Sequence, residues 1–112
     1  MQSSDKIRIR HMIDAAKEAM SFAAGRNRKD LDRDRMLLLS LVKSIEILGE
    51  AASRISEEER LEYHKIPWRD IVAMRNRLIH GYFDINLDIV WHTVTKELPP
   101  LIMELEEALS QV

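Results

Sequence analysis

The chain has 112 residues, no cysteine, three glycines and three prolines, with 46% hydrophobic and 32% charged residues. This composition predicts one folded, cytoplasmic helical domain over residues 1–112 and excludes disulfides, thiolate metal sites and a membrane span of ~20 apolar residues. The net charge of −2 gives no sign of nucleic-acid binding, although residues 64–82 carry four Lys/Arg against one Asp/Glu. Such a local positive patch would attract phosphate. Charges that alternate along solvated helix faces would, however, give the same numbers of basic and acidic residues in this segment.

Apolar residues recur at helical spacing in two long segments. Over residues 4–24 they form a single stripe, with Ser4 or Asp5 available to cap its start. Residues 32–55 are apolar on more than one face, which predicts a central helix, or one that also faces a second subunit. Gly49 in this segment would let a neighbouring helix approach closely.

Shorter helical pieces and a long final segment follow. Ser56 and Glu59 have the capping-box spacing, in which each side chain bonds the backbone amide of the other, before one or two turns of helix. A third main helix is expected over about residues 67–79. A fourth begins near Asn86 and must kink or break at the proline pair 99–100. Together these segments predict an all-α, up-and-down bundle of four or five helices.

The side chains able to do chemistry are concentrated in one stretch, WRDIVAMRNRLIHGYFD, at residues 68–84. Eight consecutive positions hold groups that an apolar helix face does not need: Arg75, Asn76, Arg77, His80 and Tyr82. Histidine can carry a proton near neutral pH, and arginine offers phosphate oxygens a planar fork of donors. This pair suits cleavage of RNA by its own 2′-hydroxyl without a metal, with His80 moving the proton and Arg75 neutralising charge at phosphorus.

The spacing of these residues limits how they can meet. Arg75 and His80 are five residues apart, roughly 140° on an ideal helix, so they share a face only if the helix ends or distorts near Gly81. Arg75 and Tyr82 are seven apart and nearly align. We therefore expect His80 in a loosened last turn, and a complete site built by two subunits across a symmetric cleft.

A family resemblance rests on this stretch. Arg75-x4-His80 matches the R-x(4–6)-H signature of the HEPN superfamily, and Arg75-x4-His80-x-Tyr82 closely resembles HepT-like ribonuclease toxins. The upstream residues 47–52, ILGEAA, are similar to the second helix of that family. The resemblance implies a homodimeric HEPN bundle with Arg75 and His80 as the catalytic pair. It also implies Asn76 and Arg77 as supporting residues, RNA as substrate, and no metal or cofactor.

The resemblance further implies a protein partner. Toxins of this family are paired with a minimal nucleotidyltransferase antitoxin of the MntA type, which transfers AMP from ATP to the motif tyrosine, here Tyr82. A bulky anionic adenylyl group beside the cleft would repel and block RNA.

Other interpretations compete with this one. His80 and Asp84 are four apart, a spacing that can ligate a metal on a helix. Arg75 could serve only as a structural ion-pair partner of Asp70 or Glu50. The chain as a whole could be a catalytically silent module that docks to and regulates a nucleotidyltransferase, or a plain helical dimerisation protein.

Overall fold

The computed structural model describes residues 1–80 and 84–111, and for Ile79 and His80 it describes the backbone alone. Regular structure in these residues is helical throughout, which confirms the predicted all-α class. The elements are α1 (Ser3–Ala23), α2 (Asp30–Arg33), α3 (Arg35–Ser53), α4 (Glu57–Glu62), α5 (Trp68–His80), α6 (Leu87–His92), the π-helical turn η1 (Thr93–Glu97) and α7 (Leu98–Ser110). None of the described helices combines the length and the apolar character that crossing a membrane requires.

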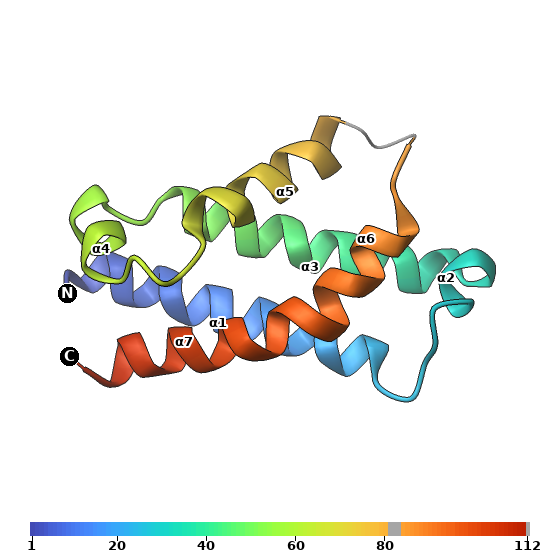
Figure 1. Ribbon diagram of the computed structural model, residues 1–112, viewed down its shortest axis with the longest axis horizontal. Helices are drawn as coiled ribbons and strands as arrows, with labels where there is room; N and C mark the ends of the chain where they lie inside the picture. The colour runs from blue at the N-terminus through green and yellow to red at the C-terminus, as the bar shows by residue number, and fades with distance from the viewer. Residues whose placement is uncertain (81–83, 112) are drawn as a thin grey trace.

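The helix α3 is the centre of the bundle. It packs along α1 on one side and against α5 on the other, while α1 also packs on α7. Figure 1 shows α5 lying across the top of α3, with both chain termini at the same end of the molecule. The central position of α3 is the one predicted from its wide apolar surface.

Aliphatic side chains from α1, α3 and α7 form the core. The largest side chains that are fully buried include Ile9, Met12, Leu41, Ile45, Leu98 and Leu105. Burying a side chain of this size contributes about 1.5–3 kcal/mol relative to leaving it in water. The core therefore fixes α1, α3 and α7 firmly, and α5 is held chiefly through α3.

The start of α3 differs from the prediction of one helix over residues 32–55. Asp34 has an extended backbone conformation, and its carboxylate accepts the amide hydrogen of Leu37 at 3.0 Å. Arg26 donates to the same carboxylate at 2.9 Å, and these two hydrogen bonds, that of Arg26 first, hold the pKa of Asp34 below its usual value. The continuous helix is wrong here because aspartate is more favourable as a helix cap than inside a turn.

The capping box at Ser56 is only half confirmed. The Ser56 hydroxyl accepts the amide hydrogen of Glu59 at 3.3 Å, as predicted. The Ser56 amide, however, donates to Asp5 of α1 at 3.0 Å instead of to Glu59, and the Ser56 hydroxyl donates to Asp5 at 2.7 Å. Asp5 is only 1% exposed, so this residue joins α1 to α4 and does not cap its own helix. The Glu59 carboxylate lies 3.9 Å from the N-terminal amine.

The last helical segment begins and bends where the sequence predicts. The Asn86 side chain accepts the amide hydrogen of Ile89 at 3.1 Å and so caps α6. The prolines at 99–100 lie in the first turn of α7 and cannot donate to the carbonyl groups four residues earlier, inside η1. The predicted kink is therefore confirmed, and it takes the form of the π-helical turn η1. The helical segment from α6 to α7 remains continuous (Figure 1).

Candidate active site

The start of α5 is fixed by Trp68. Its indole ring is buried, and the indole N–H donates to the backbone oxygen of Tyr63 at 3.1 Å. The amide of Ile71 donates to the backbone oxygen of Pro67 at 3.0 Å and begins the helical pattern. Trp68 therefore anchors α5 in the core, and α5 carries four of the predicted site residues: Arg75, Asn76, Arg77 and His80.

The crossing of α3 and α5 is closest at Gly49 and Arg75. A β-carbon at position 49 would collide with Cβ of Arg75, would lie 2.7 Å from its Cγ, and would lie 3.3 Å from the backbone oxygen of Ile71. Carbon atoms in contact are ordinarily about 3.5–4.0 Å apart. Only glycine fits this crossing, which confirms that Gly49 lets a neighbouring helix approach closely.

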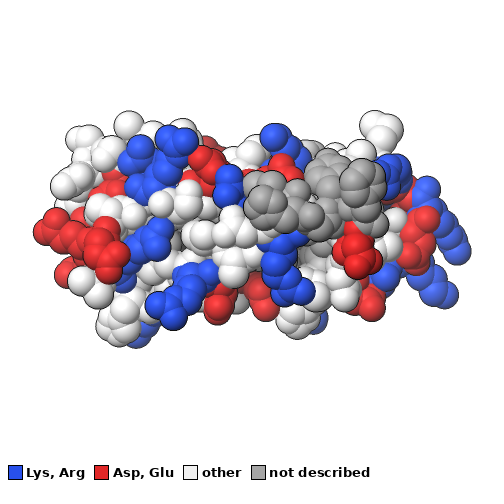
Figure 2. Space-filling model, turned by 90° about the horizontal axis from the view of Figure 1, so that it is seen from above, with Lys and Arg blue, Asp and Glu red and all other residues white. Residues whose placement is uncertain are grey.

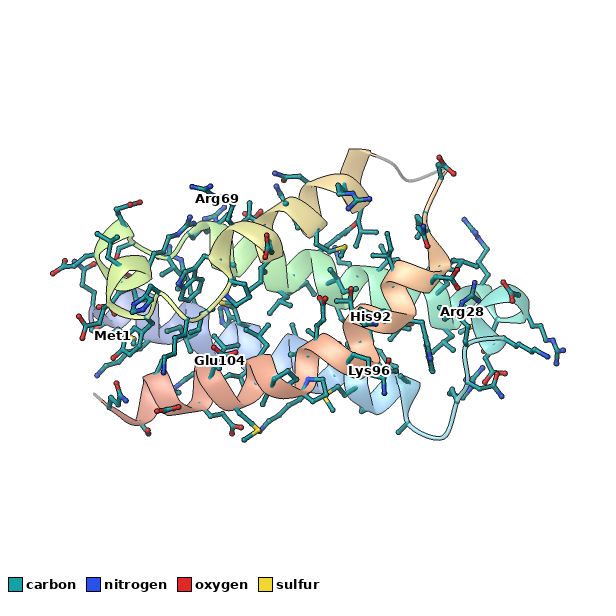
Figure 3. All side chains as sticks on the ribbon, viewed as in Figure 1. Met1, Arg28, Arg69, His92, Lys96 and Glu104 are labelled. Carbon is teal, nitrogen blue, oxygen red and sulfur yellow. The ribbon has the colours of Figure 1, made fainter. Side chains whose placement is uncertain are left out.

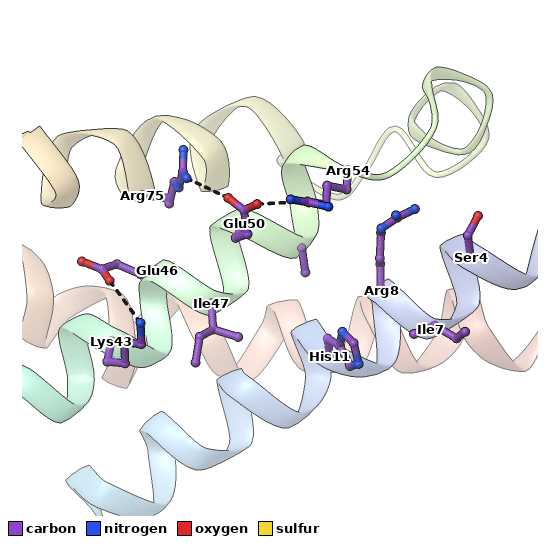
Figure 4. Close-up of a pocket in the computed structure, with 11 residues that line it drawn as sticks. Ser4, Ile7, Arg8, His11, Lys43, Glu46, Ile47, Glu50, Arg54 and Arg75 are labelled. Atoms are coloured by element: carbon purple, nitrogen blue, oxygen red, sulfur yellow. Dashed lines mark hydrogen bonds and ion pairs between the residues drawn. The ribbon is translucent and has the colours of Figure 1, made fainter.

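The guanidinium group of Arg75 is held by two side chains. Its Nη2 donates to Oε2 of Glu50 at 2.7 Å, and its Nη1 donates to Oδ1 of Asn76 at 2.9 Å. The second oxygen of Glu50 accepts from Nε of Arg54 at 2.9 Å, so one carboxylate joins two guanidinium groups (Figure 4). Of the two ion-pair partners suggested for Arg75, Glu50 is the one observed. Asn76, predicted as a supporting residue, does contact Arg75.

The Arg75 side chain lies at the edge of the bundle and keeps contact with solvent. It is 28% exposed, while its Nε is buried and has no hydrogen-bond partner among the described residues. An arginine in this position has part of its donor fork fixed by protein and part available to an anion. The arrangement suits a group that binds a phosphate oxygen in a defined orientation.

His80 is the last residue of α5 and so lies in its last turn, while the predicted loosening of that turn stays a prediction. Its side chain and the whole of Tyr82 lie outside the described residues, so their meeting with Arg75 stays a prediction. The alternative metal pair, His80 with Asp84, depends on the same side chain. Within residues 1–80 and 84–111, no three His, Cys, Asp or Glu side chains whose positions are described are grouped as they would be around a metal ion.

The structure does not bring Arg77 together with Arg75. Two residues further along α5, Arg77 lines a separate cavity of about 510 Å³ that lies between α5, η1 and α7. Lys96 and Glu104 also line this cavity. Any support that Arg77 gives to chemistry at Arg75 would therefore have to be indirect.

Charge around α5 is mixed. Arg69, in the first turn, is exposed and points away from the bundle (Figure 3). Figure 2 looks down on the α5 side and shows Lys and Arg side chains along the whole face with acidic side chains between them. On the described part of this face, basic and acidic side chains are therefore interspersed.

A groove with a volume of about 590 Å³ runs between α1 and α3 and reaches Arg75 (Figure 4). Sites for small ligands commonly measure about 300–1,000 Å³. The side chains that line it from α1 are Ser4, Ile7, Arg8 and His11. Those from α3 and its C-terminal cap include Lys43, Glu46, Ile47, Glu50 and Arg54. On both helices they are spaced three and four residues apart, so each helix presents one face to the groove.

Sequence reasoning missed this groove. The periodicity of Ser4, Ile7, Arg8 and His11 was visible, but it describes the solvent side of α1 as well as it describes a site. Only the packing of α1 against α3 shows that this face meets the face of α3 that ends at Glu50 and Arg54.

Comparison with known proteins gives consistent matches. The model of a family described as "Ribonuclease HepT-like" matches residues 12–108. The chain is 34% identical to "Putative RNase TTE0752" of Caldanaerobacter subterraneus subsp. tengcongensis over 103 residues, which cover 92% of each protein. It is 28% identical to "Putative RNase MJ0127" of Methanocaldococcus jannaschii over 101 residues, 90% of this chain and 84% of that protein.

A third relative is "Probable ribonuclease HepT" of Thermococcus cleftensis, which is 34% identical over 68 residues, 61% of this chain and 62% of that protein. No solved structure matches the chain. The region matched by the family model contains Arg75, His80 and Tyr82.

Proposed function

The chain belongs to the ribonuclease HepT-like family, and we propose that it is an RNA endonuclease that works without a metal ion. The observation that carries the proposal is the placement of Arg75. Its guanidinium is oriented by Glu50 and Asn76, remains partly exposed, and lies on the helix that ends at His80.

The proposed reaction is attack by a ribose 2′-oxygen on the adjacent phosphorus. The 2′-O–P bond forms while the P–O5′ bond breaks, which leaves a 2′,3′-cyclic phosphate and a 5′-hydroxyl. His80 takes the proton of the 2′-hydroxyl, and a proton must also reach the departing 5′-oxygen. Arg75 binds the non-bridging phosphate oxygens, where negative charge grows in the transition state. The requirement for a 2′-hydroxyl restricts the substrate to RNA.

We place the complete site in a homodimer. Arg75 and His80 are five residues apart on one helix, so on ideal geometry their side chains leave α5 in directions about 140° apart. A symmetric pair of subunits would set the arginine of one chain near the histidine of the other. Two-fold symmetry makes each such contact occur twice, so the dimer would contain two equivalent arginine–histidine pairs. Such a pair also offers two imidazoles, one for each proton transfer.

The proposed cellular role is that of a toxin controlled by a partner enzyme. A nucleotidyltransferase antitoxin of the MntA type would transfer AMP from ATP to the hydroxyl of Tyr82, releasing pyrophosphate. The new phosphodiester brings negative charge and bulk two residues from His80. RNA, itself an anion, would then be excluded from the site.

The alternative is a catalytically silent module that docks to a nucleotidyltransferase. It is favoured by the ion pair of Arg75 with Glu50, which already neutralises part of the charge that a phosphate would need. A direct experiment is to incubate the purified chain with RNA in the presence of a chelator. Cleavage by the wild type that disappears in a folded His80→Ala variant supports the nuclease. Absence of cleavage together with tight binding to the nucleotidyltransferase supports the silent module.

A further inference from the structure

We propose that the groove between α1 and α3 binds a single-stranded stretch of RNA next to the phosphate held at Arg75, with the guanidinium groups of Arg8 and Arg54 on its phosphates. The inference rests on the proposed ribonuclease function and specifies where the rest of the substrate lies. It depends on the charge, the shape and the position of the groove.

The groove has an excess of positive charge. Four cationic side chains line it against two carboxylates, and both carboxylates have cationic partners. Half-buried Glu46 lies 4.0 Å from the exposed amine of Lys43, a long and weak ion pair. Glu50 is shared between Arg54 at 2.9 Å and Arg75 at 2.7 Å. One carboxylate bound to two guanidinium groups leaves one positive charge over at that end of the groove.

Arg8 adds a second uncompensated charge. It is half-buried on α1, and it forms no ion pair and no side-chain hydrogen bond with any described residue. In Figure 4 its side chain extends from α1 toward the level of Arg54, the residue that caps the end of α3. A half-buried arginine that pairs with no carboxylate is poised to accept an anion from outside the chain.

The remaining surface of the groove suits ribose and base. Ile7 is 50% exposed and Ile47 is 41% exposed, and they lie on opposite walls of the same groove. His11 is exposed on the α1 wall and offers a flat ring on which a base can stack. Proteins that bind single strands combine cations for the backbone with such surfaces for the bases.

The length of the groove fits a short strand. Arg54, which caps α3, comes eleven residues after Lys43, and this separation is roughly 16 Å at 1.5 Å per residue. The groove reaches Arg75, so a strand bound in it leads directly to the proposed reacting phosphate.

A second copy of the chain fits the groove less well. A two-fold contact brings the same patch onto itself, and this patch has more cations than carboxylates. Two half-exposed isoleucines offer little apolar area to offset that repulsion. An anionic strand is the occupant that the charge favours.

The test measures binding of a fluorescein-labelled 2′-O-methyl uridine oligonucleotide by anisotropy, over a series of salt concentrations. The methylated ribose has no nucleophile, so binding is read without cleavage. Arg8→Glu is compared with Arg10→Glu, the same charge change two residues along α1, where Arg10 lines a different cavity with Glu106 of α7. Arg8→Gln, which removes the charge without reversing it, should give an intermediate effect.

We expect Arg8→Glu to weaken binding at least about tenfold, with a salt slope lower by about 0.7 for each phosphate that the protein no longer neutralises. Arg10→Glu should change the affinity much less. Equal losses of affinity for the two variants overturn the inference, because they would report net charge alone. Unchanged binding in Arg8→Glu with an altered sedimentation mass also overturns it, in favour of a second copy.

A parallel cleavage assay of the wild type on unmodified RNA, in the presence of a chelator, separates this inference from the proposed function. If the wild type cleaves RNA but binding does not depend on Arg8, the groove is rejected as the RNA-binding site and the nuclease function is retained. Arg8-dependent binding by a wild type that never cleaves rejects the nuclease and keeps the groove as an RNA-binding surface.

Discussion

Arg75 of α5 places its first two side-chain carbons where a side chain on residue 49 of α3 would have to lie, so the position of the proposed catalytic guanidinium depends on Gly49 having none. The same helix turn supplies Glu50, which orients that guanidinium at 2.7 Å. Two adjacent residues of α3 thus set both the distance of α5 and the direction of Arg75.

Replacing Gly49 with alanine should destabilise the protein and reduce RNA cleavage. Alanine in a helix ordinarily stabilises by about 1 kcal/mol over glycine. Here the new methyl group must push α5 away, and overpacking typically costs about 1–3 kcal/mol. Urea unfolding measures the net effect. Ser53→Ala, at an exposed site on the same helix, is the control and should be close to neutral. A Gly49→Ala variant that is more stable than wild type contradicts the tight crossing.

Removing Glu50 should lower the turnover rate for RNA more than it weakens RNA binding. In Glu50→Ala the guanidinium groups of Arg75 and Arg54 lose their shared acceptor but keep their charge, so the site becomes more positive and less ordered. We expect kcat to fall about tenfold, since misplacing a transition-state donor costs one to two orders of magnitude. Glu50→Gln keeps an oxygen acceptor and should lose less. A rise in kcat would mean that Glu50 suppresses Arg75 instead of positioning it.

Asp5→Ala should be among the most destabilising substitutions at any polar residue of the chain. The Asp5 carboxylate is 1% exposed and accepts two hydrogen bonds from Ser56, 51 residues away. Its loss leaves the half-buried amide and hydroxyl of Ser56 without their acceptor, and an unpaired group costs up to about 1–3 kcal/mol when it is buried. Thermal unfolding checks this, with Asp5→Asn as the milder variant because the amide can still accept and donate. Equal stability of Asp5→Ala and wild type would contradict the link between α1 and α4.

Acid should destabilise the junction of α2 and α3 through Asp34. The hydrogen bond from Arg26, and then that from the Leu37 amide, hold the pKa of Asp34 below its usual value in the folded state. A carboxyl with a depressed folded-state pKa stabilises the fold above its unfolded pKa, and this contribution is lost as the pH falls through the folded pKa. The melting temperature of Asp34→Asn should therefore be lower at neutral pH and should fall less steeply on acidification. An acid limb as steep as that of wild type counts against this role.

Tyr82→Phe should keep nuclease activity and escape silencing by the nucleotidyltransferase. Phenylalanine lacks the hydroxyl that would accept AMP. Intact mass after incubation with the partner and ATP gives the readout. The chain has two tyrosines, so Tyr63→Phe is a matched control and should still gain the AMP mass. Inactivation of Tyr82→Phe as efficiently as wild type would rule out this tyrosine as the modified residue.

Local patterns predicted most of the fold. The stripe of α1, the cap at Asn86 and the bend at the proline pair depend on residues within a turn or two of one another, and the structure confirms them. The break at Asp34 was missed because its capping role depends partly on Arg26, eight residues away in another segment.

Local sequence patterns could not predict contacts between segments that are distant in the chain. Nothing in the sequence marks Asp5 as the partner of Ser56, and a capping box is an equally good local explanation of Ser56 and Glu59. The same holds for the candidate site. The motif on α5 identified Arg75, whereas the groove leading to it requires Arg8 and Arg54 to be brought together by helix packing.

The catalytic role of Arg75 is tested most directly by the initial rate of RNA cleavage, in the presence of a chelator, by wild type and by Arg75→Ala. Arg69→Ala, an exposed arginine on the same helix, is the matched control. We predict a loss of about 10²–10³-fold for Arg75→Ala, as for other donors that stabilise transition-state charge, and a rate near that of wild type for Arg69→Ala. Cleavage by Arg75→Ala at the wild-type rate, or wild-type cleavage that stops when divalent ions are removed, would contradict metal-independent catalysis by Arg75.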